Sequence, residues 1–354
     1  MATEPKIEVI QDSVTTIEGN TGMAASIAVI GAFDSEVTDL TVCNTAAVAH
    51  SIFGTTGTAG TFKGTDAIDY LFYGASQLLV CNITTWSSGD NPTASTTITN
   101  EKLNAALAKL HHEEFDILVI ADELADASQT IVTTWLANEF KDKFPHGQVA
   151  QLTKATTSAY TTSVATFGNN VYYINTQTIT YNGTTLDLNR STAYIAGVIA
   201  SMDVNRSLTA KTIPNVTGIS PEYTFESGDI GAKLMELNVP IMKVRNRRKN
   251  NYICVNSLLP NNLDLYINRT RDYVLNRISV ETQLGEPSND ITLEGIENII
   301  ENVKNNCVEE LHLLEDIIYH VEKRTATCVD VIIDKMVFAG IITDIKIHYS
   351  IEVQ

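Results

Sequence analysis

Short apolar runs that alternate with amphipathic helical patterns constrain this chain more than any other feature of its sequence. The runs cover residues 27–31, 77–83 and 115–121, and the last two each follow a segment with helical spacing of apolar residues. Continuously apolar strands between such helices are typical of a mostly parallel sheet that is covered on both faces. The first part of the chain is therefore predicted to be an α/β domain.

Three helices of this domain are predicted from apolar stripes. One begins behind an N-cap at Asn100, a second follows Asp122, and a third covers Arg190–Met202. Before the third helix, Tyr181-Asn182-Gly183-Thr184 is a strong turn signal and predicts a β-hairpin within residues 171–188. The stripes are Leu103, Ala106, Leu107 and Leu110 in the first helix, Ile131, Val132, Trp135, Leu136 and Phe140 in the second, and Tyr194, Ile195, Val198, Ile199 and Met202 in the third.

The composition changes after residue 240, and a second domain of the α+β class is predicted there. Four basic residues stand close together at its start, in a chain that is otherwise strongly acidic. They are expected either to dock an acidic face of a neighbouring subunit or, about as readily, to form a solvated loop. These residues are Arg245, Arg247, Arg248 and Lys249.

The rest of this second region reads as two helices and three strands. Its second helix would turn Ile296, Ile299, Ile300 and Val303 inward. The expected elements are a strand at Tyr252–Ser257, a long helix at Leu265–Gln283, a helix that begins at Thr292, and a closing pair of strands at Cys328–Asp334 and Phe338–Ile342.

Both ends of the chain alternate apolar and polar residues as half-buried strands do. Neither has a hairpin partner beside it in sequence, and free strand edges are an aggregation liability. The two arms are therefore expected to add strands to neighbouring subunits, with pairing of the two ends within one chain as the alternative. The apolar positions are Ile7 and Val9 at the start and Ile345, Ile347, Tyr349, Ile351 and Val353 at the end. The predicted parts are an N-terminal arm at 1–22, the α/β domain at 23–244, the C-terminal α+β domain at 245–342 and a C-terminal strand arm at 343–354.

The charge balance restricts the partners of this chain. Its 354 residues carry 42 acidic and 24 basic side chains, a net charge of −18. So large a negative charge disfavours binding to nucleic acid or to anionic membranes, because both bind basic protein surfaces. The start lacks the build of a signal peptide, and no apolar run approaches the ~20 residues of a membrane-spanning helix. The five cysteines are far apart and read as buried thiols of a protein made in a reducing cytoplasm.

Candidate chemical motifs in this chain are weak. The series Gly54, Gly57, Gly60 and Gly64 lacks the Gly-Lys-Ser/Thr ending of a phosphate loop and reads as a flexible surface turn. His111 and His112 are adjacent at a helix end, and neighbouring side chains on a helix point about 100° apart, so they are not expected to converge on a metal. No Ser-His-Asp elbow occurs. No catalytic residue, metal site or cofactor is therefore predicted.

The order of segments resembles the sheath proteins of contractile phage tails and of phage-tail-like bacteriocins. The most specific likeness is Ala196-Gly197-Val198-Ile199-Ala200 followed by Asp203-Val204-Asn205-Arg206, which is similar to the family's Ala-Gly-x-x-Ala-x-x-Asp-x-x-Arg segment. The apolar strand Ile27–Ala32, the helix with Arg269 and Arg271 and the terminal strand are also similar. Asn82 stands where arginine is common, and Leu237-Asn238-Val239-Pro240 departs from the usual Gly-Val-Asn. The likeness runs over nearly the whole chain and rests on order and spacing.

This resemblance implies a structural, non-enzymatic subunit whose α/β domain is subtilisin-like in topology only. Such subunits stack as six-membered rings around an inner tail tube, and they contract to drive the tube through a cell envelope. The implied partners are copies of the chain itself, the tube protein, and the baseplate and tail-terminator proteins. The particle would assemble in the bacterial cytoplasm and be released on lysis. Residues 13–22 and Thr343-Asp344 would be the hinges of the two arms.

Two further readings remain beside the sheath. One is a generic self-assembling or binding protein with a parallel-sheet domain, and the other is a small-molecule-binding α/β enzyme. Within the sheath reading, the helix at Thr292–Asn306 is the candidate for contact with the tube, because Glu294, Glu297 and Glu301 lie on its outer face. The matching patch on the tube would then be basic.

Overall fold

The predicted parallel sheet is present as the centre of the larger part of the molecule. The computed structural model describes residues 25–55, 60–89, 91–142, 144–281, 293–325 and 328–338. Five strands run parallel in the order β3-β1-β6-β7-β8, and the short β2 pairs antiparallel with β3 at one edge. These strands are β1 (Ser26–Gly31), β2 (Thr41–Cys43), β3 (Gln77–Asn82), β6 (Ile117–Ile120), β7 (Gly147–Gln151) and β8 (Val171–Asn175).

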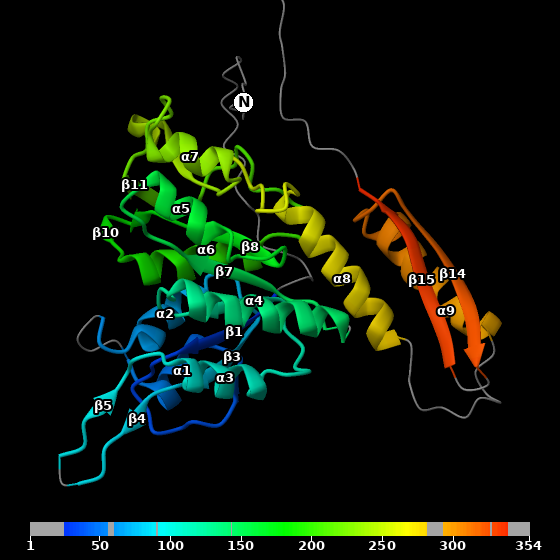
Figure 1. Ribbon diagram of the computed structural model, residues 1–354, viewed down its shortest axis with the longest axis horizontal. Coiled ribbons are helices and arrows are strands. Elements are labelled where there is room, and N and C mark those ends of the chain that lie inside the picture. Colours follow the sequence, from blue (N-terminus) through cyan, green and yellow to red (C-terminus); the bar gives the residue numbers. More distant parts are fainter. Residues whose placement is uncertain are drawn as a thin grey trace, which may run out of the picture.

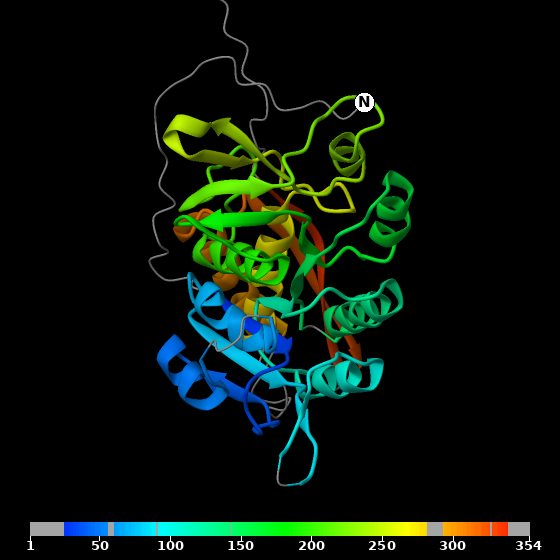
Figure 2. The same cartoon turned by 90° about the vertical axis from the view of Figure 1, so that its left-hand side faces the viewer.

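Helices cover both faces of this sheet, as expected for strands that are apolar throughout. Ile27 and Val29 of β1 pack with α1, α2 and α6, whereas Ala28 and Ile30 pack with α3 and α4 on the other face. Figure 2 shows α3, α4 and α5, coloured cyan to green, along one side of the molecule. The bounds are α1 (Ala46–Phe53), α2 (Lys63–Leu71), α3 (Asn100–Lys109), α4 (Asp126–Lys141), α5 (Thr157–Val164) and α6 (Leu188–Ser201).

Helix α6 is the most deeply buried helix among the described residues, and it carries the motif that suggested a family. It packs against α2, against the main sheet and against β9. A Cβ atom at Gly197 would lie 2.3 Å from the carbonyl oxygen of Tyr70, and one at Gly74 would lie 2.3 Å from that of Gly197. The glycine of the Ala-Gly pair is therefore needed for the close crossing of α6 over the end of α2.

A small antiparallel sheet covers the other side of α6. Its turn at Asn182 and Gly183 has positive φ angles of 47° and 84°, as the sequence predicted for a tight hairpin. The third strand lies in a stretch that carried no clear strand pattern. The sheet has the order β10-β9-β11, with β9 (Thr178–Tyr181), β10 (Thr184–Thr185) and β11 (Val216–Ser220).

Several predicted details are wrong. The N-cap of α3 is Thr99, whose hydroxyl accepts a hydrogen bond from the Lys102 amide at 3.3 Å, and Asn100 is the first helical residue.

Strand β7 had no apolar signal because it contains Gln148 and Gln151, both buried. Gln148 satisfies its amide by a 2.7 Å bond with Gln129 of α4, and this pairing offsets the cost of burying a polar group. The series of glycines is not simply a surface turn either, because Gly64 is buried in α2 and donates to the Ala32 carbonyl at 2.8 Å.

The C-terminal part consists of two helices and a long hairpin that extend from the α/β body along α8 (Figure 1). The predicted strand pair Cys328–Asp334 and Phe338–Ile342 is wrong in its first strand, because residues 328–337 form one continuous strand that pairs with the preceding segment 316–325. Residues 339–342 of the predicted second strand lie outside the described residues. Residue 245, the predicted domain boundary, lies inside β12, and Tyr252 and Cys254 of its partner β13 belong to the α/β core. The described elements that follow β11 are α7 (Ile230–Glu236), β12 (Met242–Asn246), a 3₁₀ turn (Arg247–Lys249), β13 (Asn251–Cys254), α8 (Leu265–Glu281), α9 (Leu293–Asn305), a π-helical turn (Asn306–Glu310), β14 (Asp316–Thr325) and β15 (Cys328–Val337), of which α8, α9 and the β14–β15 hairpin form the C-terminal part. A minor hairpin is formed by β4 (Thr85–Trp86) and β5 (Ala94–Ser95).

The mixed α/β architecture is therefore confirmed, whereas the subtilisin-like description of its topology stays a prediction. Within the described residues, no helix is both long enough and apolar enough to cross a membrane.

Candidate assembly surfaces

The first turns of α8 fasten the C-terminal part to the α/β body through buried charged groups. Arg269 is 3% exposed and donates to the carbonyl oxygens of Met202 and Asp203 at 3.1 and 3.3 Å. Tyr172 of β8 donates to Asp272 at 2.5 Å. Burial raises the pKa of Asp272 and lowers that of Arg269, since it disfavours each charged form. These bonds connect α8 rigidly to the end of α6 and to the edge strand of the sheet.

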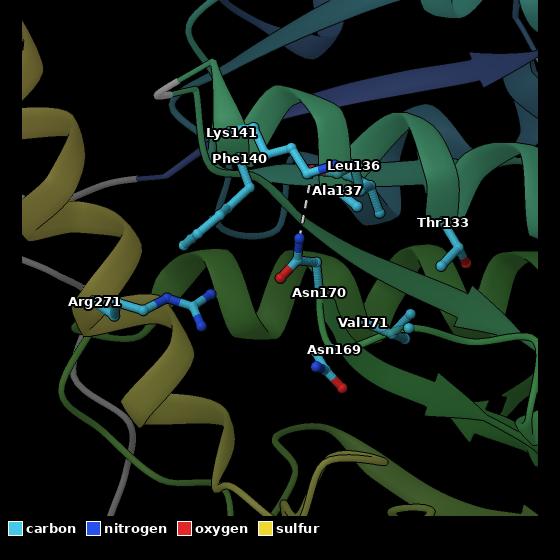
Figure 3. Close-up of a pocket in the computed structure, with 10 residues that line it drawn as sticks. Thr133, Leu136, Ala137, Phe140, Lys141, Asn169, Asn170, Val171 and Arg271 are labelled. Atoms are coloured by element: carbon cyan, nitrogen blue, oxygen red, sulfur yellow. Dashed lines mark hydrogen bonds between the residues drawn. The ribbon is translucent and has the colours of Figure 1, made fainter.

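A hollow of about 470 Å³ lies beside this junction, between α4, the turn before β8 and α8. In Figure 3, Arg271 reaches from α8 toward Phe140 and Asn170. Its guanidinium lies 4.9 Å from the centre of the Phe140 ring, within range of a cation–π contact, and bonds Asp272 at 2.6 Å. The amide of Asn170 donates to the Leu136 carbonyl at 3.4 Å and links the turn to α4. The hollow is thus bounded by one side chain from the C-terminal part and by the α/β body elsewhere.

The β14–β15 hairpin has one covered face and one open face. Ile317 and Tyr319 of β14 and Val331, Ile333 and Met336 of β15 pack toward a small core with α9. On the opposite face Ile318 and Ile332 are 45% and 37% exposed. Within the described residues the hairpin is a sheet of two strands only, so each strand has an edge that no other described strand occupies. Such edges can accept a further strand through backbone hydrogen bonds.

Helix α9 confirms the predicted amphipathic pattern. Ile300 and Val303 are buried, Ile296 and Ile299 are partly buried, and Glu294, Glu297 and Glu301 are exposed. One of these three carboxylates already has a partner, because the Tyr319 hydroxyl donates to Glu301 at 3.0 Å and to the Glu297 carbonyl at 3.1 Å. Burial and the Glu301 carboxylate raise the pKa of Tyr319 to about 12. The acidic face therefore points outward and is fixed to β14 at one point.

The four basic residues form the tip of the β12–β13 hairpin. Arg245, Arg247, Arg248 and Lys249 are all exposed. The turn is ordered by the Asn246 side chain, which accepts from the Lys249 amide at 3.2 Å, and by Asn250 with a φ of 48°. Arg247 pairs with Glu222 at 2.5 Å, an exposed contact of small energetic value. The tip is thus a short, well-defined turn that presents positive charge. It is compatible both with docking to an acidic face of a neighbouring subunit and with a solvated loop.

Some contacts that hold the α/β body and the C-terminal part together have no signal in the sequence, and some of the predicted residues lie outside the part of the chain that the structure describes. The Tyr172–Asp272 contact joins residues 100 positions apart, and no local spacing announces such a pair. The predicted strand arms with Ile7, Val9, Ile345, Ile347, Tyr349, Ile351 and Val353 lie outside the described residues.

Comparison with known proteins gives a consistent result. Residues 96–247 match the family model of the phage tail sheath protein central domain. This segment runs from just before α3 to the tip of the β12–β13 hairpin. No curated protein matches the chain.

Solved structures extend the likeness to nearly the whole chain. A sheath tail protein from Desulfitobacterium hafniense is 12% identical, with a TM-score of 0.63 over 90% of this chain and 93% of that one. A chain of the anti-feeding prophage helical sheath in its contracted state is 14% identical, with a TM-score of 0.65 over 98% and 99%. A chain of the anti-feeding prophage baseplate structure is 15% identical, with a TM-score of 0.67 over 99% of each chain.

These comparisons define the class of protein as one with the fold of tail sheath proteins. The resemblance to contractile tail sheath proteins is thereby confirmed, in sequence over residues 96–247 and in fold over nearly the whole chain.

Proposed function

We propose that this protein is the structural subunit of a contractile tail sheath. Copies would polymerise as stacked hexameric rings around an inner tube, and contraction would drive the tube through a target cell envelope. The match of residues 96–247 to the sheath central domain, together with the shared fold along the chain, carries this proposal. The subunit would be non-enzymatic and would also contact the baseplate and tail-terminator proteins. It would be made in the bacterial cytoplasm and released on lysis within a phage or a phage-tail-like particle.

The free edges of the β14–β15 hairpin are the proposed acceptors for the arms of neighbouring subunits. The apolar residues Ile345, Ile347, Tyr349, Ile351 and Val353 alternate with polar ones, as a strand added to a one-sided sheet requires. Ile318 and Ile332 on the open face offer partners beside the incoming strand. An arm bonded through its backbone keeps its contacts while the chain before it bends, so that the linkage persists when the subunits rotate.

The energy of contraction would come from better subunit packing in the contracted state. The buried bonds of Arg269 and of Tyr172 with Asp272 are proposed to make α8 a stiff connection between the α/β body and the hairpin. A rotation of the α/β body would then be transmitted through α8 to the β14–β15 hairpin, which the arms would link to neighbouring subunits. The basic tip at 245–249 is proposed to dock an acidic face of a neighbouring subunit.

Deletion of the residues after Ile342 tests the proposed assembly. We expect the full-length protein to form tubes with cogwheel cross-sections by negative-stain electron microscopy, alone or when co-expressed with its tube protein. The shortened protein is expected to stay folded, as judged by circular dichroism, but not to polymerise. Polymers of the shortened protein would contradict strand exchange at this end, whereas a compact nucleotide-binding monomer from the full chain would contradict the sheath itself.

The contact with the tube is tested on α9. Reversal of all three charges in the variant Glu294→Lys, Glu297→Lys, Glu301→Lys is expected to prevent sheath assembly on preformed tubes, because the matching tube patch would be basic. The matched control is Glu101→Lys, Glu113→Lys, Glu114→Lys, which reverses three charges near the two ends of α3. If the α9 variant assembles on tubes as readily as the control, α9 is not the tube-facing helix.

A second candidate function is a self-assembling protein without a contractile role. The basic hairpin tip and the free strand edges would serve such a protein equally well. Co-expression with the tube protein separates the two, because a generic polymer would form without enclosing a tube.

A further inference from the structure

The C-terminal ends of α3 and α4 bring together three side chains that bind metal ions in other proteins. His111 and His112 follow α3, and Asp142 follows α4. One ligand atom from each of the three residues lies within 4.8 Å of those of the other two. All three side chains are exposed and accessible to an ion from solvent.

The backbone of His112 explains why two adjacent histidines converge, which the sequence did not predict. Helix α3 ends at Lys109, and His112 has a φ of 66°, in the left-handed region. The two imidazole rings therefore lie against each other, with their centres 3.6 Å apart, and the ring of His112 also rests on Phe144 at 4.8 Å. The expected angle of about 100° between neighbouring side chains holds only within a helix.

A buried carboxylate orients this pair. Glu139 of α4 is 1% exposed, and one of its oxygens accepts from Nδ1 of His111 at 2.5 Å. Its other oxygen accepts from the backbone amide of His112 at 3.2 Å and holds the left-handed turn. A carboxylate bonded to one ring nitrogen fixes the imidazole and leaves the second nitrogen for a metal, an arrangement common around protein-bound zinc. Nε2 of His111 is the nitrogen left for that role.

We propose that this cluster is a binding site for one divalent transition-metal cation of the Zn²⁺ or Ni²⁺ type. Nε2 of His111, a ring nitrogen of His112 and a carboxylate oxygen of Asp142 are its ligands, and water completes the coordination. Imidazole nitrogens favour these ions over Mg²⁺ or Ca²⁺, which prefer oxygen ligands throughout. Metal–nitrogen distances of about 2.0–2.1 Å bring ligand atoms closer together than 4.8 Å, and rotation of the exposed Asp142 side chain toward the two rings closes such a gap. A hollow of about 450 Å³ lined by His111, Glu139 and Asp142 leaves room for the water.

The site is tested by titrating the unpolymerised full-length protein with ZnCl₂ and, separately, NiCl₂ in a calorimeter. We expect one equivalent to bind with a micromolar dissociation constant. His111→Gln, His112→Gln and Asp142→Asn should each weaken binding at least tenfold, while circular dichroism stays that of the unchanged protein.

His320→Gln is the matched control, because His320 is also an exposed imidazole and lies 2.7 Å from Asp334 and 3.5 Å from Glu322. Among the described residues His320 belongs to no group of three potential metal ligands, and its replacement is expected to leave the one-equivalent binding intact. The proposal is overturned if the unchanged protein binds neither metal at 1 mM. It is also overturned if binding survives both His111→Gln and His112→Gln, or if it disappears in His320→Gln instead.

Discussion

The α/β body and the β14–β15 hairpin bury their strands in different ways. In the body, the residues of β1 are shielded by helices on both faces, and the buried amide of Gln148 pairs with Gln129 of α4 inside the same body. The hairpin is covered on one face by α9 and leaves Ile318 and Ile332 exposed on the other. Within the described residues, the strands of the body are therefore covered on both faces, whereas the hairpin exposes apolar side chains on one face and has backbone edges that no described strand occupies.

The largest stability difference is expected at the buried junction of α8. Replacing Arg269 by alanine leaves two backbone carbonyls without their donor inside the protein, and we expect a loss of about 3–5 kcal/mol in the free energy of unfolding. Arg206→Ala is the matched control, because its guanidinium is 69% exposed and 3.6 Å from Asp203, and it should cost less than about 1 kcal/mol. Urea denaturation of unpolymerised protein measures both, and equal losses would contradict the view of α8 as a rigidly fastened element.

A histidine in each region should respond to pH with opposite sign. His146 is buried beside Phe115, its Nε2 has no hydrogen-bond partner among the described residues, and burial lowers its pKa from 6.5 to about 4. The unfolded chain therefore binds this proton more readily, and stability is lost as the pH falls from 6.5 toward 4, by up to about 3 kcal/mol. The pKa of exposed His320 is raised by its bond to Asp334, so its contribution is present below pH 6.5 and lost as the pH rises through the raised value.

Denaturation at several pH values, with and without the histidine, isolates each contribution. His146→Phe should remove the acid-side loss while keeping the ring stacked on Phe115. His320→Phe should change the profile little and in the opposite direction. A profile unchanged by His146→Phe would mean that this histidine is not held neutral in the folded protein.

The smallest change in the free energy of unfolding is expected for a substitution on the open face of the hairpin. The same substitution should nevertheless weaken assembly. Ile332→Ser is expected to change the free energy of unfolding by less than about 0.5 kcal/mol. If an incoming strand packs beside Ile332, the lost contact of about 0.2–1 kcal/mol should raise the protein concentration needed for polymerisation up to several-fold. Val42→Ser is the matched control, because Val42 is 51% exposed on the edge strand β2 of the body and should leave polymerisation unchanged. Sedimentation at a series of concentrations distinguishes the two, and equal behaviour would remove the hairpin from the proposed interface.

Most of the α/β body was predictable because its signals are local. The apolar runs of β1, β3 and β6 and the stripe of α4 follow directly from residue spacing, as do the turn at Asn182 and the outward carboxylates of α9. Strand β7 escaped prediction because buried Gln148 and Gln151 stand in place of the apolar residues that mark a buried strand. An alternating pattern alone did not show that β15 continues through Val337 and pairs with the preceding segment, where Ile317 and Tyr319 of β14 pack against α9.

The sequence alone was therefore enough to predict β1, β3 and β6, the helices α3, α4 and α6, and the family that the chain resembles. Those properties depend on hydrophobic periodicity and on short motifs such as Ala196-Gly197, and both act over a few residues. Only the tertiary structure decided that Tyr172 meets Asp272, that Arg269 holds the end of α6, and that His111, His112 and Asp142 converge. Contacts of this kind join separate elements, and they depend on how helices end and cross, which no local pattern encodes.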